Sequence, residues 1–200
     1  MEQILEYFGA IAGLVYIVLE IKQHRAMWIV GLLSSIVYVF VFFSAKFYAG
    51  MGLHVYYVSM SIYGFVQWSQ KEKVNHTDKS ATSDSKIIYR RLNRSMTCWL
   101  ALTSVILFGG IYYVLQQTDS PVVVGDSFTS ALSIVGTWML ARRIIEHWFC
   151  WIVVNAISVY LYSTQGLYPT LVLYSCFTIM AGVGLYIWIK NGVRTDDRSL

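Results

Sequence analysis

Residues 148–162 read WFCWIVVNAISVYLY, an apolar run that contains no charged side chain. On an α-helix, residues three or four positions apart share a face, so Trp148, Trp151 and Asn155 form one stripe. A lipid-facing surface gains nothing from an amide, whereas a helix that lines a ligand path uses one. The alternative is that Trp148 belongs to an aromatic belt at the membrane interface and that Asn155 bonds a neighbouring helix.

The composition of the whole chain indicates a membrane protein. Of its 200 residues, 56% are hydrophobic and only 13% are charged, whereas soluble domains carry roughly 25% charged residues. The apolar runs are continuous and do not alternate with polar residues, which favours membrane-spanning helices over a β-barrel. Cys98, Cys150 and Cys176 each lie alone in an apolar segment without CxxC spacing, so we interpret them as small residues in helix packing.

Seven segments have the length and hydrophobicity of a membrane span. They are Ile4–Ile21, Met27–Phe43, Met51–Trp68, Met96–Leu115, Val122–Ala141, His147–Ser163 and Tyr168–Ile189. A rise of about 1.5 Å per residue lets such lengths cross a hydrocarbon core of roughly 30 Å. The fifth segment has the weakest signal, because polar residues dilute its first half: Asp126, Ser127, Thr129, Ser130 and Ser133. The first segment lacks the basic flank and the cleavage site of a signal peptide.

The basic residues predict an orientation. Of the 15 Lys and Arg residues, 14 follow the first, third, fifth or seventh segment, and Lys46 alone lies in the opposite set of loops. Because cytoplasmic loops carry the excess of basic residues, we expect the N-terminus outside and the C-terminus in the cytoplasm. The same location explains the net positive charge as solvated loops in contact with the cytoplasm and the lipid bilayer, so we expect no nucleic-acid partner.

The chain also contains two parts that look like copies. Residues 1–68 hold the first three segments, residues 69–95 are polar and predict a flexible linker, residues 96–116 form a connecting helix, and residues 117–200 hold the last three segments and a short tail. Aromatic residues recur at an offset of 120 positions: Trp28, Tyr48 and Trp68 in one part, Trp148, Tyr168 and Trp188 in the other.

Because a single helix connects the two triplets of segments, both triplets have the same orientation in the membrane. The predicted fold is therefore an all-α membrane protein with seven transmembrane helices in a 3+1+3 arrangement of parallel repeats, as in small sugar transporters of the SWEET type. Such transporters bind substrate near the middle of the bilayer, between the two halves. The alternative is a duplicated set of helices that packs without transporting anything.

Aromatic and polar residues on the helices expected to face each other form a candidate binding site. The site residues are Ser35, Tyr38, Tyr56, Tyr63, Gln67, Trp148, Trp151, Asn155 and Tyr174, and the stripe of the sixth helix continues to Ser158 and Tyr162. Aromatic faces attract cations, and amides pair with a carboxamide or a hydroxyl. A cavity of this kind without a buried acid or base suits a flat ring with a delocalised positive charge, and it does not suit an anion.

No motif for catalysis, a metal or a cofactor is present. The four His residues lie in loops or at predicted helix ends, and the sequence has no HExxH, GxSxG or Walker motif, so we expect no enzyme. The acids Glu6, Glu20 and Asp126 lie near helix ends. We interpret them as side chains that reach the membrane interface, with proton coupling as the alternative.

Two stretches resemble the PnuC family of vitamin transporters. One is the pattern W-x-x-W-x-x-x-N-x-x-S at Trp148–Ser158, followed by Gln165-Gly166-x-Tyr168; the other runs from Tyr56-Tyr57 to Tyr63-Gly64-x-x-x-Trp68. The resemblance implies a homotrimer in a bacterial inner membrane that takes up nicotinamide riboside by facilitated diffusion. A cytoplasmic kinase would then trap the substrate for NAD biosynthesis. By motif position, Trp148, Trp151 and Asn155 would hold the nicotinamide, and Tyr63 would complete the pocket.

Some positions depart from the family pattern. His54 and Ser61 stand where the family often has Gln and Asn, and Leu173 and Val183 stand where some members have Glu and Asn. Thiamine, another cationic aromatic, or a different B vitamin is therefore an alternative substrate. A membrane scaffold or sensor without transport is the alternative from another class.

Overall fold

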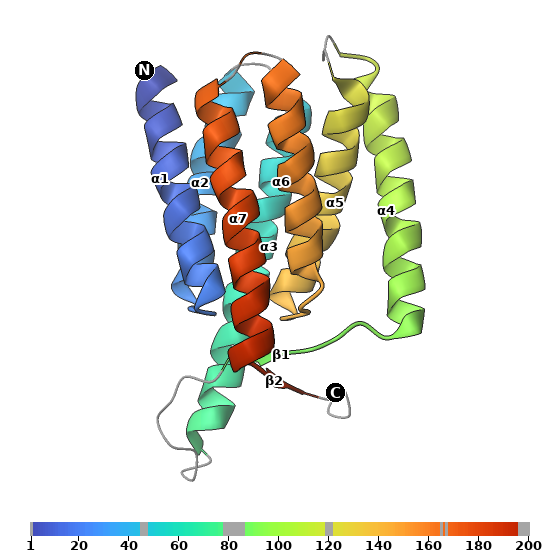
Figure 1. Ribbon diagram of the computed structural model, residues 1–200. Helices are drawn as coiled ribbons and strands as arrows, with labels where there is room; N and C mark the ends of the chain where they lie inside the picture. Colours follow the sequence, from blue (N-terminus) through green and yellow to red (C-terminus); the bar gives the residue numbers. More distant parts are fainter. Residues whose placement is uncertain are drawn as a thin grey trace.

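The computed structural model describes residues 2–44, 48–77, 87–118, 122–164, 166 and 168–195. This part of the chain forms a bundle of seven helices (Figure 1), whose bounds are α1 Glu2–Ile21, α2 Ala26–Ser44, α3 Tyr48–Thr77, α4 Arg94–Leu115, α5 Val123–Ala141, α6 His147–Thr164 and α7 Tyr168–Asn191. Two short strands, β1 Ile88–Tyr89 and β2 Val193–Arg194, lie at one end. We call this end, which also carries the α1–α2 and α5–α6 turns, the basal end.

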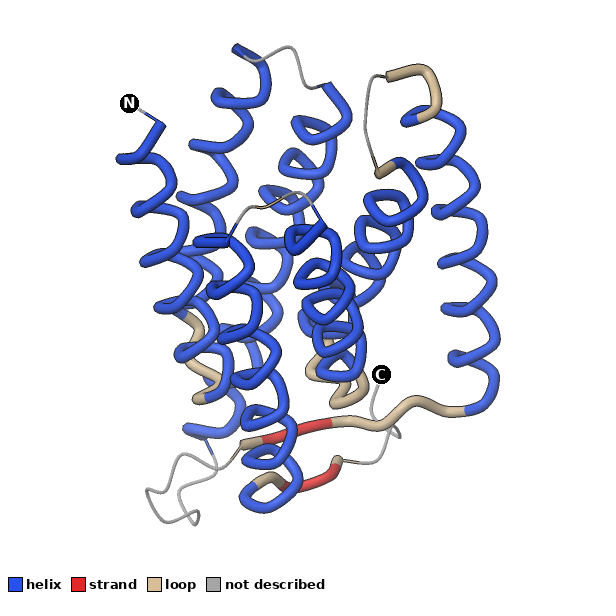
Figure 2. Tube along the Cα trace, turned by 45° about the horizontal axis from the view of Figure 1, so that its top comes forward, coloured by secondary structure: helices blue, strands red, loops and turns tan. Residues whose placement is uncertain are grey.

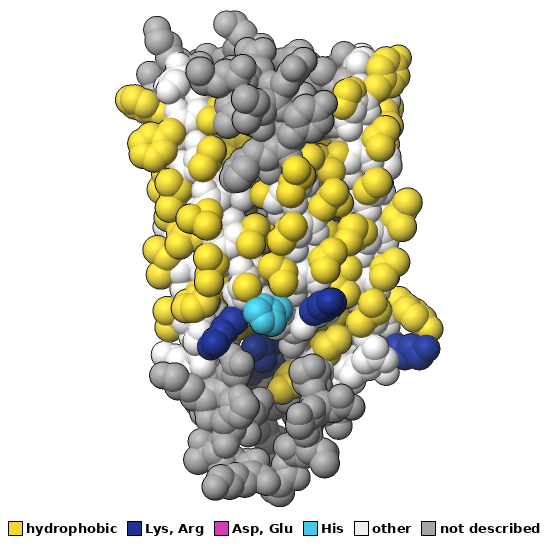
Figure 3. All heavy atoms as spheres, turned by 90° about the vertical axis from the view of Figure 1, so that its left-hand side faces the viewer, with side chains coloured by type: hydrophobic (Ala, Val, Ile, Leu, Met, Phe, Trp, Pro, Cys, Tyr) yellow, Lys and Arg dark blue, Asp and Glu magenta, His cyan; other side chains and the backbone are white. Residues whose placement is uncertain are grey.

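The all-helical prediction is confirmed, and the helices match the predicted spans closely except at α3. Four helices, α2, α4, α5 and α7, are long and apolar enough to cross a membrane by length and composition. The side of the bundle in Figure 3 carries a broad hydrophobic surface, with Lys, Arg and His side chains only near the basal end. That separation of apolar and basic side chains is typical of a protein that spans a bilayer.

The predicted linker contains more structure than expected. Helix α3 ends at Thr77 and not at Trp68, because the residues that follow Trp68 include the good helix formers Gln, Lys and Glu. Strand β1 also lies within the predicted linker and pairs in parallel with β2, with Ile88 opposite Val193 (Figure 2). Residues 78–86 of the linker, like Lys46, lie outside the described residues.

The segment that contains β1 crosses the basal end of the bundle and bonds to both turns there. The Gln23 side chain, in the α1–α2 turn, donates to the Ile88 carbonyl over 2.7 Å and accepts from the Ile88 amide over 3.1 Å. Further along, the Arg90 amide donates to the Arg143 carbonyl over 2.9 Å, and the Ile145 amide donates to the Arg90 carbonyl over 3.0 Å. The segment therefore ties the α1–α2 turn to the α5–α6 turn.

Two tryptophan pairs pack in the same way in the triplets α1–α3 and α5–α7. Trp28 and Trp68 lie edge to face with ring centroids 5.6 Å apart and planes at 90°, and Trp148 and Trp188 lie 5.6 Å apart at 88°. All four side chains are almost completely buried. They are core residues, so the alternative that Trp148 belongs to an aromatic belt at the membrane interface is wrong.

Each pair reaches across to the other triplet through one hydrogen bond. The Trp68 indole N–H donates to the Ala141 carbonyl at the end of α5 over 3.0 Å, and the Trp188 indole N–H donates to the Ile21 carbonyl at the end of α1 over 3.0 Å. The two donors, Trp68 and Trp188, are 120 positions apart, and so are the two acceptors, Ile21 and Ala141. Consistent with these bonds, α3 packs against α5 as α7 packs against α1.

The two basal turns repeat the same backbone conformation. Gln23 and Arg143 occupy the left-handed region with φ of 52° and 58°. The following amides, of His24 and Ile144, each donate to a carbonyl five residues earlier over 2.9 Å. A non-glycine residue in this conformation is uncommon, so its occurrence at both equivalent positions reflects equivalent packing.

Removing the inter-triplet bonds should weaken the bundle. We expect Trp68→Phe and Trp188→Phe each to lower the free energy of unfolding by about 1 kcal/mol for the lost hydrogen bond, with a further loss from the smaller ring. Thermal unfolding in detergent measures the effect. Trp99→Phe on the exposed face of α4 is the control, since its side chain is 67% exposed, and an equal loss there would contradict the prediction.

Candidate functional site

A cavity of about 1090 Å³ lies inside the bundle, and its lining residues come from all seven helices. Its size is at the upper end of ligand pockets, which span roughly 300–1,000 Å³. Aromatic and hydroxyl-bearing side chains dominate the lining. Among the described lining residues none is Lys or Arg, and Glu20 and Asp126 are the acids. The cavity therefore favours a cation over an anion, because a buried anion needs positive partners.

Helix α6 contributes one wall of this cavity. Trp151, Asn155, Ser158 and Tyr162 line it at the spacing of one helix face, and Asn155 and Ser158 are only 7% and 8% exposed. The Trp151 indole N–H is buried without a hydrogen-bond partner among the described residues. The Ser158 hydroxyl, in contrast, donates to the Val154 carbonyl over 2.9 Å. A buried, unpaired donor beside an amide provides a place where a polar ligand group would bind.

Helices α1, α2 and α3 contribute residues across the cavity. Ser35, Tyr16 and Ser61 line it, with Ser35 only 5% exposed. A Cβ at Gly31 would lie 3.0 Å from the Tyr16 ring and 3.2 Å from the Ser61 hydroxyl. The glycine thus allows these two side chains to approach α2 closely.

Helix α5 lines the cavity with a polar face. The face consists of Asp126, Thr129, Ser130, Ser133 and Thr137. The Thr137 hydroxyl donates to the Ser133 carbonyl over 2.8 Å, and the Thr129 hydroxyl donates to the Gly125 carbonyl over 2.9 Å. All of these except Thr137 are among the residues that weakened the sequence signal for a fifth span. Their helical spacing indicated a shared face, which sequence reasoning did not use.

An aromatic cluster lines the cavity farther from the basal end. The His54 ring lies 5.1 Å from Tyr38, 5.3 Å from Phe42 and 5.5 Å from Tyr57 between centroids. These four side chains are all part of the cavity lining. Stacked faces of this kind accept a flat ring and attract a cationic one.

Six of the nine residues predicted for the site line the cavity. They are Ser35, Tyr38, Tyr56, Trp151, Asn155 and Tyr174. The Tyr56 hydroxyl donates to the Ile134 carbonyl of α5 over 2.8 Å, so its ring is the part left for a ligand. The Tyr174 ring lies 5.1 Å from that of Tyr162.

The other three predicted residues do not line the cavity. Trp148 is fully buried against Trp188, one turn nearer the basal end than Trp151. The Gln67 amide donates to the Tyr63 hydroxyl over 2.9 Å, and both lie past the last residue of α3 in the lining, Ser61. Helical spacing placed Asn155 on the face of α6 that lines the cavity, whereas on α3 the spacing from Tyr56 continued past the end of the cavity to Tyr63 and Gln67.

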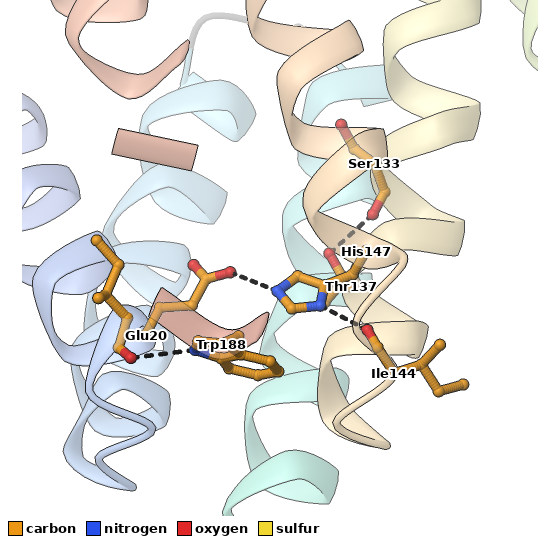
Figure 4. A network of polar contacts seen from close by, with 7 residues as sticks. Glu20, Ser133, Thr137, Ile144, His147 and Trp188 are labelled. Atoms are coloured by element: carbon orange, nitrogen blue, oxygen red, sulfur yellow. Dashed lines mark hydrogen bonds and ion pairs between the residues drawn. The ribbon is translucent and has the colours of Figure 1, made fainter. Parts of the chain in front are cut away.

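Sequence reasoning missed a buried contact between α1 and α6. Glu20 and His147 are 3% and 0% exposed, and Glu20 Oε1 lies 3.1 Å from His147 Nε2 (Figure 4). The interpretation of Glu20 as a side chain reaching the interface is therefore wrong, as is the expectation of a cavity without an acid. Among the described residues, no group of three or more His, Cys, Asp or Glu could hold a metal ion.

Comparisons with known proteins identify similar transporters. The family model described as nicotinamide mononucleotide transporter matches residues 3–190. The nicotinamide riboside transporter PnuC of Escherichia coli (strain K12) is 26% identical, in an alignment that covers 98% of this chain and 89% of that protein. The riboflavin/roseoflavin transporter RibM of Streptomyces davaonensis is 27% identical over 79% of this chain and 71% of its own.

A solved structure has the same fold. The crystal structure of the vitamin B3 transporter PnuC superposes with a TM-score of 0.72 at 23% sequence identity. The match covers 93% of this chain and 80% of that one. The bundle described above is thus a known transporter fold.

Proposed function

Because this chain belongs to the nicotinamide mononucleotide transporter family, we propose that it carries nicotinamide riboside into the cell by facilitated diffusion. The resemblance to PnuC proteins drawn from the sequence is confirmed by the family match and by the relatives of that name. Membership makes the chain a multi-pass membrane transporter. Trapping of the substrate by a cytoplasmic kinase completes the proposal, since a facilitator alone only equalises concentrations.

The charge of the cavity is the observation that carries this choice of substrate. Nicotinamide riboside has a positively charged pyridinium ring. The described residues that line the cavity would surround this ring with aromatic rings, hydroxyl groups and two acids, without Lys or Arg. Nicotinamide mononucleotide adds a phosphate, which in proteins is bound by Arg, Lys or helix N-termini. The riboside therefore suits this cavity better than the mononucleotide does.

Recognition is assigned to α6 and to the rings that face it. The Asn155 amide can both donate to and accept from the carboxamide of nicotinamide, and the unpaired Trp151 N–H is a second donor beside it. Tyr38, Tyr56 and Tyr174 supply ring faces for the pyridinium, and Tyr38 and Tyr174 also supply hydroxyls for the ribose. Trp148 is left out of the proposed site, because its ring is enclosed in the basal core.

The proposed architecture is the 3+1+3 arrangement of parallel repeats. It is supported by the matched tryptophan pairs, by the reciprocal bonds to Ala141 and Ile21 and by the matched turns at Gln23 and Arg143. We place the N-terminus outside and the basal end in the cytoplasm, as the basic residues predict. A homotrimer in the bacterial inner membrane is part of the same proposal.

Equilibrium binding of radiolabelled nicotinamide riboside to the purified protein tests the proposal. We expect saturable binding that unlabelled nicotinamide riboside displaces and that nicotinamide mononucleotide displaces much less. Thiamine, whose ring is also cationic, and riboflavin serve as competing ligands. Displacement by much lower concentrations of thiamine than of unlabelled nicotinamide riboside would assign the protein to thiamine, and no binding of any of these compounds would favour a scaffold or sensor.

A further inference from the structure

The contact between Glu20 and His147 joins the two triplets at the floor of the cavity. Glu20 lies on α1 and His147 at the start of α6. On α1 the lining of the cavity ends at Glu20, on α5 at Thr137 and on α7 at Phe177. Beyond these residues lie several of the most completely buried side chains of the described chain: Met27, Trp68, Leu140, His147, Trp148 and Trp188.

The hydrogen-bond geometry of His147 fixes how many protons the contact needs. His147 Nδ1 lies 2.6 Å from the Ile144 carbonyl oxygen, which can only accept, so Nδ1 carries a proton. His147 Nε2 lies 3.1 Å from Glu20 Oε1. A hydrogen bond there requires one more proton, carried either by the imidazole or by the carboxyl group. Without that proton, a lone pair on Nε2 would face a carboxylate.

We propose that Glu20 and His147 together bind one proton, and that this proton latches the basal end of the transporter closed. With the proton present, the bond holds α1 of one triplet against α6 of the other. When the proton leaves to water in the cavity, two buried acceptors face each other, which is costly in a place of low polarity. The basal end then opens more readily toward the cytoplasm.

Most of the described side chains packed around Glu20 and His147 are uncharged, so this pair is the main group that can gain or lose a proton at the floor of the cavity. On α1, Tyr16 faces Glu20 from one turn away, and Tyr57 of α3 faces Tyr16. Helix α7 presents the uncharged Trp188, whose ring lies 5.0 Å from His147, and α2 presents Met27 and Trp28, which carry no charge. The end of α5 contributes Leu140 and Ala141, both uncharged, to the same buried core as Trp188.

The nearest basic residues of the α5–α6 turn stack on other rings. The Arg142 guanidinium lies 4.4 Å from the centre of the Trp138 ring, and the Arg143 guanidinium lies 4.7 Å from that of Trp68. Glu146, the acid next to His147, accepts a hydrogen bond from the Leu92 amide over 3.2 Å. Each of these charges is thus held by a different contact.

The Glu20→Gln substitution keeps the hydrogen bond between α1 and α6 but removes the shared proton. A neutral His147 with its proton on Nδ1 exposes a lone pair on Nε2, and the Gln amide can donate to it. The bond between the triplets then survives at every pH, and without the carboxylate no charge balances a protonated His147 in this buried place. Glu146→Gln is the matched control, because a Gln oxygen still accepts from the Leu92 amide.

The test is uptake of radiolabelled nicotinamide riboside into proteoliposomes between about pH 5 and 8; this part rests on the proposed function. The charge of the pyridinium does not change in that range, so any pH dependence of uptake comes from the protein. We expect uptake by the wild type and by Glu146→Gln to rise roughly tenfold with pH, and uptake by Glu20→Gln to stay low and flat. A Glu20→Gln profile that follows the wild type would overturn the latch.

A second measurement needs no substrate. The His147 ring lies 4.6 Å from Trp148 and 5.0 Å from Trp188 between centroids, close enough for a change of charge on the Glu20–His147 pair to alter their fluorescence. We expect the tryptophan fluorescence of the wild type to change with pH, and that of Glu20→Gln to lack this change. If the wild type carries no riboside but shows the fluorescence change, the substrate is wrong and the latch stands; equal fluorescence profiles in both proteins would exclude the latch.

Discussion

Replacing Asn155 with Ala is expected to weaken nicotinamide riboside binding about 10- to 100-fold. Asn155 is 7% exposed on the cavity wall formed by α6, where its amide can pair with the carboxamide of the ligand. Without the amide, that carboxamide would be buried with unpaired donors and acceptors, at a cost of about 1–3 kcal/mol. Isothermal titration or radioligand binding to the purified variant measures the change.

The same substitution outside the cavity provides the control. Asn191 is exposed at the end of α7, so Asn191→Ala should bind the riboside as the wild type does. Ser69→Ala, on α3 past the cavity, should also leave binding unchanged. If Asn155→Ala binds with the affinity of these controls, the recognition role of α6 is disproved.

Replacing Gly184 with Ala is expected to destabilise the bundle by about 1–3 kcal/mol, the usual cost of overpacking a core. A Cβ at this position would collide with the Trp148 ring, which is fully buried in the core. For a chain of this size, the loss corresponds to a decrease in Tm of about 2–12 °C. Thermal unfolding in detergent gives the value directly.

A glycine two residues earlier on the same helix should respond in the opposite direction. A Cβ at Gly182 would meet nothing within 4 Å. Because alanine favours a helix over glycine by roughly 0.5–1 kcal/mol, Gly182→Ala should leave Tm unchanged or raise it slightly. Equal shifts for the two variants would show that the tryptophan pair tolerates displacement.

The offset of 120 positions was the most informative pattern in the sequence. It matched Trp28 with Trp148 and Trp68 with Trp188, and the structure packs both pairs with the same geometry. Helical spacing from Trp151 correctly brought Asn155 to one face of α6. Such features depend on local periodicity and on rare residues, both of which a single sequence displays.

Features that depend on the depth of the cavity could not be predicted. Spacing placed Tyr63 and Gln67 on the expected helix but could not show that the cavity ends before them. The contact between Glu20 and His147 joins residues 127 positions apart, and neither residue carries a motif that points to the other. Polar residues near the ends of apolar helices have several common explanations, and only packing distinguishes among them.

The segment that crosses the basal end limits how the two triplets can move. It is bonded to the α1–α2 turn through Gln23, to the α5–α6 turn through Arg90 and to the tail through β2, where the Val193 amide donates to the Ile87 carbonyl over 2.8 Å. Two bodies joined at one edge by such a cross-brace cannot slide apart in parallel while these bonds persist. They can only tilt about it, so the brace is the fulcrum around which the bundle would rock.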